Sequence, residues 1–232
     1  MRMIAVYHKA GALSGISHLD VQRTLQRAFR RAGIPLAYSN GFNPHPQLSF
    51  ASALSTGATS DAEWFDVQLL TDMEPEAFIE RVNAVMPQGL WLSHGFAAPE
   101  GFGSLSAKTA GAAYEVEIQF DQAVTGQALQ EAITSLLAGE IIVNKRTKSG
   151  IKPVDIRPQI QMVSVTGIEG NNANLLVHGK LQADGGLRVE LLLGALYDRL
   201  AAHGTARIHR KAMYFAGDGP LPRLPEDWKE KE

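Results

Sequence analysis

The chain has 232 residues, of which 45% are hydrophobic and 20% charged. This composition can form one large or two small globular domains and excludes a disordered chain. The net charge is −2 and there is no cysteine. A nucleic-acid-binding surface would therefore be local, and disulfides, cysteine-ligated zinc and iron–sulfur ligation by this chain are excluded.

The N-terminal stretch MRMIAVYHKA is too short and too polar for a signal peptide. No apolar run reaches the ~18 residues that a membrane helix needs. We therefore expect a cytoplasmic protein without membrane association.

The first half of the chain alternates strand-like and helix-like patterns. Ser17 and Asp20 form a capping-box pattern, and the apolar residues that follow recur at helical spacing. Gly33 and Pro35 predict the end of this helix, as a left-handed cap and as a breaker. The expected elements are a strand at 3–7, a helix at 17–32, strands at 47–54 and 63–70, a helix at 75–86 and a strand at 90–96.

The second half repeats this order after residues 99–112, a small, polar and glycine-rich stretch that we interpret as a linker. The expected elements are a strand at 114–120, a helix at 126–137, strands at 154–165 and 174–181, a helix at 189–202 and a strand at 205–215. Residues 217–232 are rich in proline and charge, which is typical of a strap or a frayed end.

Each half thus has the order β-α-β-β-α-β, which is typical of the ferredoxin-like split βαβ fold. We predict an α+β protein of two tandem ferredoxin-like domains with antiparallel sheets, at residues 1–98 and 113–216. Because the halves share little residue identity, the duplication is inferred from the element order alone.

Four arginines lie on the first predicted helix, with Asp20 the one acid near them: Arg23, Arg27, Arg30 and Arg31. At about 100° per residue, they lie opposite the apolar face. Guanidinium groups match the oxygens of phosphate, so the pattern indicates a phosphate or nucleic-acid site. The alternative is a solvated helix face, although such faces usually mix charges of both signs.

A second basic cluster, within NKRTKSGIKPVDIRP at 144–158, has five cations against Asp155: Lys145, Arg146, Lys148, Lys152 and Arg157. Its glycine, serine and threonine content indicates a mobile hairpin loop, and such loops commonly contact nucleic-acid backbones. An ordinary surface loop is the alternative. A third small cluster, RIHRK at 207–211, falls in the last predicted strand.

The segment SNGFNPHPQLSFA at 39–51 combines several constrained residues. His45 stands between two prolines, which hold its backbone extended, and Asn43 can form an Asx turn ahead of it. Beside Tyr38 and Asn40, the imidazole could orient a substrate or move a proton, so His45 is a candidate catalytic residue. It could equally brace the loop. His18 could cap the first helix or point at the same site.

No complete catalytic constellation is found in the sequence. Metal-binding histidine spacings, the GxSxG motif, a P-loop and a dinucleotide fingerprint are all missing. Asp61, Glu63 and Asp66 lie on or beside a predicted strand, but no partner base is indicated.

Residues 17–57, SHLDVQRTLQRAFRRAGIPLAYSNGFNPHPQLSFASALSTG, resemble the opening signature of the bacterial radical-SAM-linked domain family. This domain of unknown function occurs free-standing or fused behind a radical-SAM enzyme. The resemblance continues through EWFDVQL at 63–69 and, weakly, at VDIRP at 154–158. The matching motif positions are His18, Asp20, Arg23, Arg27, Arg30, Arg31, Tyr38, Asn43 and His45.

The resemblance implies a radical-SAM protein as partner. That partner would carry the S-adenosylmethionine and the iron–sulfur cluster, with no cofactor in this chain.

Three functions follow as hypotheses. The first is an accessory module that holds RNA or a ribonucleoprotein, such as a ribosomal particle, for the radical-SAM enzyme. The second is a metal-independent RNA-processing or RNA-modifying enzyme with His45 as general acid or base. The third is a protein-interaction scaffold.

Overall fold

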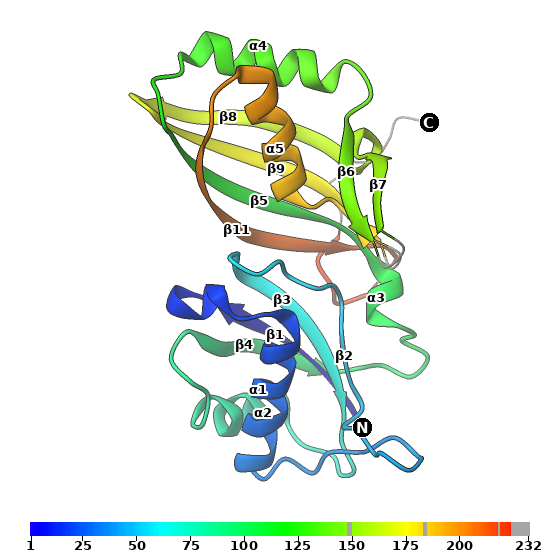
Figure 1. The fold of residues 1–232 in the computed structure, drawn as a ribbon. Helices are drawn as coiled ribbons and strands as arrows, with labels where there is room; N and C mark the ends of the chain where they lie inside the picture. Colours follow the sequence, from blue (N-terminus) through cyan, green and yellow to red (C-terminus); the bar gives the residue numbers. More distant parts are fainter. Residues whose placement is uncertain (148–149, 183–184, 218, 224–232) are drawn as a thin grey trace. The chain divides into compact units, whose positions relative to one another are not determined.

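The computed structural model describes residues 1–147, 150–182, 185–217 and 219–223 (Figure 1). The chain forms two compact units. Unit 1 comprises Met1–Thr109 with Phe215–Pro220, and unit 2 comprises Ala110–Tyr214 with the chain from Leu221 onward. Each unit combines helices with antiparallel strands, which confirms the predicted mixed fold of helices and antiparallel sheets.

Unit 1 is built on a sheet with the strand order β2-β3-β1-β4, in which each neighbouring pair is antiparallel. Strand β1 pairs with β3 from Arg2↔Gln68 to Lys9↔Ser60. The elements of this unit are β1 (Arg2–Lys9), the 3-10 helix η1 (Gly11–Gly15), α1 (His18–Arg31), β2 (Leu48–Phe50), β3 (Thr59–Gln68), α2 (Pro75–Asn83), β4 (Leu90–Ala97) and α3 (Leu105–Lys108).

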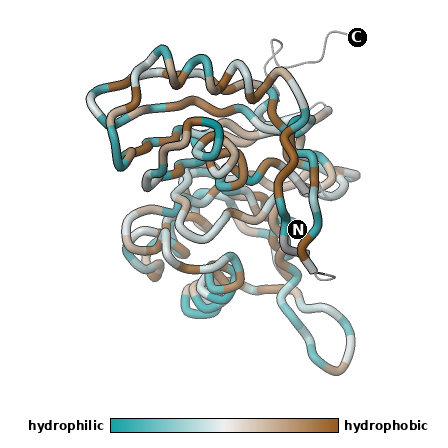
Figure 2. The backbone as a smooth tube through the Cα atoms, turned by 45° about the horizontal axis from the view of Figure 1, so that its top comes forward, coloured by the Kyte–Doolittle hydropathy of each residue, from teal (hydrophilic) through white to brown (hydrophobic). Residues whose placement is uncertain are grey.

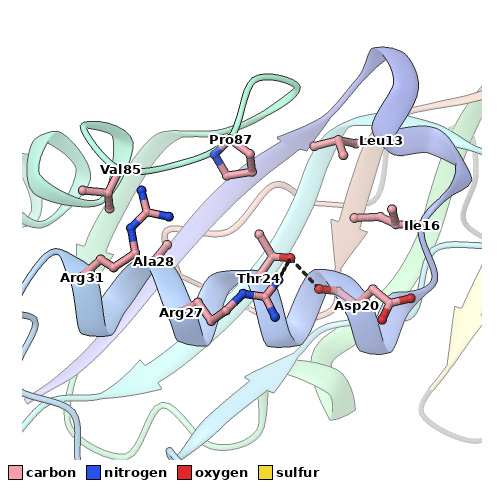
Figure 3. A pocket seen from close by; sticks show the side chains of 9 residues that line it. All are labelled: Leu13, Ile16, Asp20, Thr24, Arg27, Ala28, Arg31, Val85 and Pro87. Atoms are coloured by element: carbon pink, nitrogen blue, oxygen red, sulfur yellow. Dashed lines mark hydrogen bonds between the residues drawn. The ribbon is translucent and has the colours of Figure 1, made fainter.

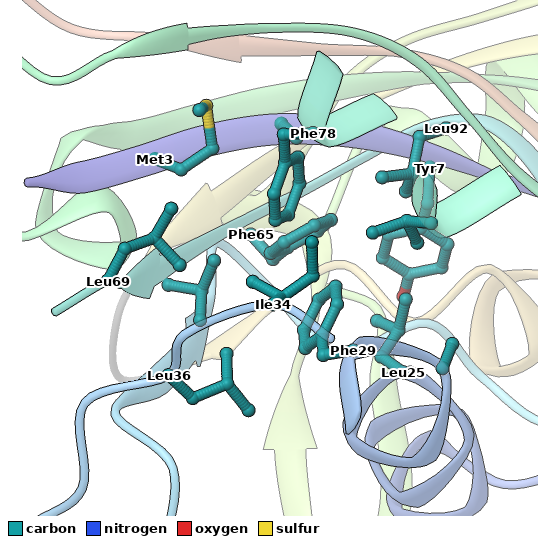
Figure 4. Close-up of a cluster of buried hydrophobic side chains, with 14 of the residues drawn as sticks. Met3, Tyr7, Leu25, Phe29, Ile34, Leu36, Phe65, Leu69, Phe78 and Leu92 are labelled. Carbon is teal, nitrogen blue, oxygen red and sulfur yellow. The ribbon is translucent and has the colours of Figure 1, made fainter. Parts of the chain in front are cut away.

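Helices α1 and α2 pack on the same face of this sheet. Successive strand residues point to opposite faces, and alternate residues of β1 such as Met3 and Tyr7 enter the core between sheet and helices. The ring of Phe29 from α1 lies 5.8 Å from that of Phe65 in β3 and 5.7 Å from that of Phe78 in α2. These rings join both helices to the sheet (Figure 4).

The first helix begins and ends where the sequence predicts. Ser17 is the N-cap, and its hydroxyl accepts a hydrogen bond from the Asp20 amide at 3.2 Å. Gly33 has a φ of 64°, a left-handed conformation that glycine adopts without strain. Arg81 of α2 donates to the carbonyls of Ala32 and Gly33, at 2.8 and 3.0 Å, and so satisfies the free end of α1.

Unit 2 has the strand order β8-β9-β5-β11, with the short β10 also paired to β9. A separate two-stranded hairpin, β6-β7, lies in the sequence between α4 and β8. The elements are β5 (Thr109–Phe120), α4 (Gly126–Leu137), β6 (Ile142–Thr147), β7 (Gly150–Asp155), the 3-10 helix η2 (Arg157–Gln159), β8 (Ile160–Glu169), β9 (Asn172–Gln182), β10 (Gly185–Gly186), α5 (Val189–Leu200) and β11 (Gly204–Phe215).

Strand β5 shows how this sheet separates an apolar from a polar face. Val116, Ile118 and Phe120 are buried, whereas Glu115 and Glu117 between them are exposed. Helices α4 and α5 contribute their own buried leucines to the core. Figure 2 shows how hydrophobic and hydrophilic residues follow one another along the chain.

Several predicted element bounds differ from those of the structure. The strand expected at 47–54 is limited to Leu48–Phe50, and the helix expected at 75–86 ends at Asn83, where Pro87 follows closely. The strand expected at 154–165 is interrupted at Arg157–Gln159, because Pro158 lacks the amide that a strand would use. The expected linker at 99–112 contains α3 and the first residues of β5.

Candidate functional site

The arginines of α1 are all exposed, and we call Arg23, Arg27, Arg30 and Arg31 the arginine face. The helix buries its opposite side in the core of unit 1, which fixes the direction in which this face points. From Val21 to Ser60 the sequence contains no aspartate or glutamate. The arginine face therefore has no acidic neighbour within this stretch of chain.

Hydrogen bonds along the helix orient part of the arginine face. Arg27 Nη2 donates to Thr24 Oγ1 at 2.9 Å, and Thr24 Oγ1 donates to the Asp20 carbonyl at 2.7 Å. Arg30 Nε donates to the Gln26 carbonyl at 3.3 Å. A guanidinium group has five N–H donors, so these contacts direct the side chains without using up their binding capacity.

A groove of about 340 Å³ runs beside the arginine face (Figure 3). Its polar residues are Asp20, Thr24, Arg27 and Arg31 of α1. Its apolar residues come from three parts of unit 1: Leu13 and Ile16 before α1, Ala28 within it, and Val85 and Pro87 after α2. The groove combines two cationic groups with an apolar floor, which suits a phosphate-bearing organic ligand.

Asp20 is the acid of this groove, and its carboxylate is already engaged. Ser17 Oγ donates to Asp20 Oδ2 at 2.6 Å, and Arg23 Nη1 donates to Asp20 Oδ1 at 3.2 Å. The Ser17 hydrogen bond first, and then Arg23, lower the pKa of Asp20 against the opposing effect of burial. The carboxylate thus stays ionised and anchors the start of α1.

Residues 39–46, called the proline loop below, form a closed and projecting turn. The Ser39 amide donates to the His45 carbonyl at 2.8 Å, and the His45 amide donates to Ser39 Oγ at 3.1 Å. Tyr38 and Pro46 form a β-bridge at its base. Figure 1 shows the loop as a blue segment projecting between α1 and β2.

The candidate histidines occupy different positions in unit 1. His45 is exposed on the proline loop beside the exposed Asn43, and no side-chain partner of its imidazole is seen in the described part of the chain. His18 is half-buried, with its ring edge-on to Phe50 at a centroid distance of 4.6 Å. The structure thus gives His18 a packing contact and leaves His45 open to solvent.

The second basic cluster forms the hairpin β6-β7, which we call the basic hairpin. Lys145 lies directly opposite Lys152 in the register. Like charges in directly opposed positions destabilise a strand pair, so this pair favours an anion as ligand. Of Arg146 the backbone alone is described, and Lys148 lies outside the described residues.

Arg157 anchors the base of the basic hairpin. Its Nε donates to the Leu137 carbonyl at 2.7 Å and its Nη1 to the Ile160 carbonyl at 2.9 Å. Asp155 Oδ1 accepts from the amides of Ile141 and Arg157, both at 2.9 Å. Part of the guanidinium of Arg157 is therefore engaged within the protein, and its phosphate contact stays a prediction.

A cluster that sequence reasoning missed lies on the second face of the unit 1 sheet. His8 Nδ1 is 3.3 Å from Asp61 Oδ1, and the His8 ring stacks on Trp91 at 4.6 Å and 10°. His94 is exposed overall, but its ring meets Trp64 edge-on at 5.3 Å, and burial first and then His8 lower its pKa. The one sequence feature that pointed to this cluster was Asp61, an acid on a predicted strand for which the sequence indicated no partner base.

The described residues contain no group of three or more histidine, aspartate or glutamate side chains placed to hold a metal ion. Within the same residues, no helix has the length and apolar character needed to cross a bilayer.

The sequence matches one known protein family over most of its length. Residues 2–188 match the family described as "Uncharacterized protein conserved in bacteria (DUF2344)". The chain belongs to this family. No curated protein matches the chain.

Solved structures show a similar fold. A chain of the Cbf5–Nop10–Gar1 complex matches with a TM-score of 0.56 and 12% identity, over 91% of this chain and 48% of that one. A chain of an H/ACA RNP bound to a substrate RNA containing 2'-deoxyuridine matches with a TM-score of 0.50 and 12% identity, over 90% of this chain and 46% of that one. The present chain thus spans about half the length of these proteins, and the likeness concerns the fold alone.

Proposed function

We propose that the chain is an accessory RNA-binding module that presents RNA or a ribonucleoprotein to a radical-SAM enzyme. The observation that carries this proposal is the arginine face beside its groove, within a stretch that has no acid from Val21 to Ser60. In a chain of net charge −2, such a concentration of one sign marks a local anion-binding surface.

The geometry of α1 suits the phosphate backbone of RNA. Arg27 and Arg31 are one helical turn apart and both border the groove. The Thr24 hydroxyl holds the Arg27 guanidinium in place, which reduces the entropy that phosphate binding costs. Each guanidinium can offer two parallel N–H donors to a phosphate, and the displaced counterions add to the affinity.

The basic hairpin offers a second contact in unit 2. Lys145 and Lys152 stand side by side across the two strands, so a phosphate between them would remove their mutual repulsion. We include both lysines in the RNA-binding surface. Arg157 also supports the fold of the hairpin, because it donates to the carbonyls of Leu137 and Ile160.

The fold supports the proposal in two ways. Both units have the same antiparallel order, β2-β3-β1-β4 and β8-β9-β5-β11, which we interpret as two ferredoxin-like units. Similar folds occur in the Cbf5–Nop10–Gar1 complex and in an H/ACA RNP that was solved with a substrate RNA. Because a fold does not fix a function, this likeness adds to the argument from the arginines and does not replace it.

The radical-SAM part of the proposal rests on the sequence resemblance of residues 17–57. The chain has no cysteine, so the iron–sulfur cluster and S-adenosylmethionine would belong to the partner. We place both proteins in the bacterial cytoplasm.

Binding of single-stranded RNA over a salt series tests the proposal. The slope of the logarithm of the affinity against the logarithm of the salt concentration counts the phosphate contacts. Changing Arg27→Gln and Arg31→Gln together should lower the magnitude of this slope by about 1.4, because each lost contact accounts for about 0.7. A control variant, Arg188→Gln with Arg199→Gln, removes the same charge from α5 and should keep the wild-type slope. No binding by the wild type at low salt, or equal losses in both variants, would contradict the proposal.

A further inference from the structure

Phe42 lies in the proline loop with its side chain completely exposed, at 106% of the reference value. Tyr38 at the base of the loop is 44% exposed. Within the described part of the chain, no aromatic contact to Phe42 is seen. A large apolar ring is thus presented to solvent, and a second accessible ring lies at the base of the same loop.

The loop that carries Phe42 is held in one shape. Besides the two Ser39–His45 hydrogen bonds, the Gln47 amide donates to the Ala37 carbonyl at 2.9 Å, and Gln47 Nε2 donates to the Tyr38 carbonyl at 3.1 Å. Two prolines fix φ on the descending side of the loop, and Gly41 has a φ of 129°, where other residues are strained. The backbone that carries the ring is therefore preorganised, which lowers the entropy cost of a contact.

The charge around the loop favours a polyanion with flat apolar groups. Residues 33–60 carry no charged side chain of either sign apart from histidine, and the nearest ionic groups before them in the sequence are Arg30 and Arg31. Tyr38 follows Arg31 by seven positions, so the chain between them spans at most about 25 Å. A strand of a few nucleotides can cover such a distance.

Unpaired RNA combines the two groups that this surface can bind. Its phosphates suit guanidinium groups, and its free bases stack on aromatic rings in a way that tolerates every base. Bases inside a duplex are already stacked on one another and cannot reach a ring at a loop tip. We propose that the proline loop is a base-stacking element for single-stranded RNA, with Phe42 as its main contact and Tyr38 as the second. This inference rests on the proposed RNA-binding function and specifies its substrate class.

The test uses the full chain and three dye-labelled probes: an oligouridine of about 12 nucleotides, an abasic strand of the same length, and a duplex of that length. Fluorescence anisotropy gives the affinity for each. Phe42→Ala should weaken oligouridine binding by about tenfold and leave the salt slope unchanged, because stacking releases no counterions. Binding to the abasic strand and to the duplex should not change.

Matched variants separate stacking from other effects. Phe42→Trp should keep the wild-type affinity, whereas Phe42→Leu, which is apolar but has no ring, should behave like Phe42→Ala. Leu70→Ala truncates another exposed apolar side chain of unit 1 and should have no effect on binding. Circular dichroism establishes that each variant is folded.

The outcomes distinguish base stacking by the proline loop from RNA binding by the chain as a whole. If the wild type binds oligouridine but Phe42→Ala binds equally well, or if Phe42→Ala weakens the abasic strand to the same extent, base stacking by the loop is overturned and RNA binding stands. If the wild type binds none of the three probes at low salt, the proposed function is overturned and the stacking role with it.

Discussion

The ammonium group of Lys9 is buried at the end of β1, with 1% of the residue exposed. Its Nζ donates to the carbonyls of Ser14 and Ile16, both at 3.0 Å, and thereby ties η1 and the start of α1 to the sheet. Burial lowers the pKa of Lys9, while the buried Glu63 carboxylate acts in the opposite direction. A single side chain thus positions the helix that carries the arginine face.

We predict that Lys9→Met lowers the free energy of unfolding by about 3 kcal/mol, because it removes two charged hydrogen bonds and leaves the carbonyls of Ser14 and Ile16 without this donor. Urea denaturation followed by circular dichroism measures the change. Lys152→Met, at an exposed position of the basic hairpin, is the control and should change stability little. A loss below about 0.5 kcal/mol for Lys9→Met would contradict the anchoring role.

Residues with a local role could be predicted from the sequence, and residues with a long-range role could not. Ser17 and Gly33 act on the helix beside them, so their positions along the chain sufficed. The contact of His8 with Asp61 depends on the pairing of β1 with β3, whose register shifts between Tyr7 and Lys9. Sequence spacing carries no information about such a shift.

Among the elements, the basic hairpin combines weak intrinsic stability with concentrated charge. It forms a sheet of its own, and an isolated two-stranded hairpin is marginally stable. Its Lys145–Lys152 pair adds repulsion at the centre. The basic hairpin thus places two neighbouring cations on an element of low intrinsic stability.

We predict that Lys152→Glu stabilises the hairpin locally by about 0.5 kcal/mol, because an opposite-charge pair replaces the repulsion. Amide hydrogen exchange of β6 and β7 should slow by about a factor of two, while affinity for RNA falls. Lys211→Glu, at an exposed position of β11, is a charge-matched control for the affinity. Faster exchange, or undiminished RNA binding, would show that the lysine pair has another role.

Element type was easier to predict than element bounds. The helices α1, α4 and α5 bury apolar residues at clear helical spacing, and their positions agree with the sequence. The basic hairpin was predicted as a mobile hairpin loop from its glycine, serine and threonine content, whereas β6 and β7 pair as antiparallel strands. The short β2 is held by its pairing with β3 more than by its own pattern.

At the scale of the whole molecule, the predicted mixture of helices and antiparallel strands is present in both units. The molecule also concentrates its arginine face in unit 1 and its paired lysines in unit 2. A protein of net charge −2 thus carries a cluster of cationic side chains in each of its two units.

The absence of cysteine over all 232 residues bears on the proposed partner. Iron–sulfur clusters are held mainly by cysteine thiolates, so radical-SAM chemistry in a complex would depend on a cluster in the other protein. We predict that the tagged chain, purified without oxygen from the cells that express it, retains a radical-SAM protein. The complex should contain iron and sulfide, measured by colorimetric assay and by the visible absorption of the cluster.

The isolated chain is the control for this measurement. After the same treatment with iron and sulfide, it should show no cluster absorption, because it offers no thiolate. The Phe42→Ala variant of the tagged chain should still retain the radical-SAM protein, because the Phe42 ring is assigned to RNA and not to the protein partner. A complex without a radical-SAM protein would contradict the partnership, whereas the RNA-binding role would still be decided by the salt dependence of the arginine face.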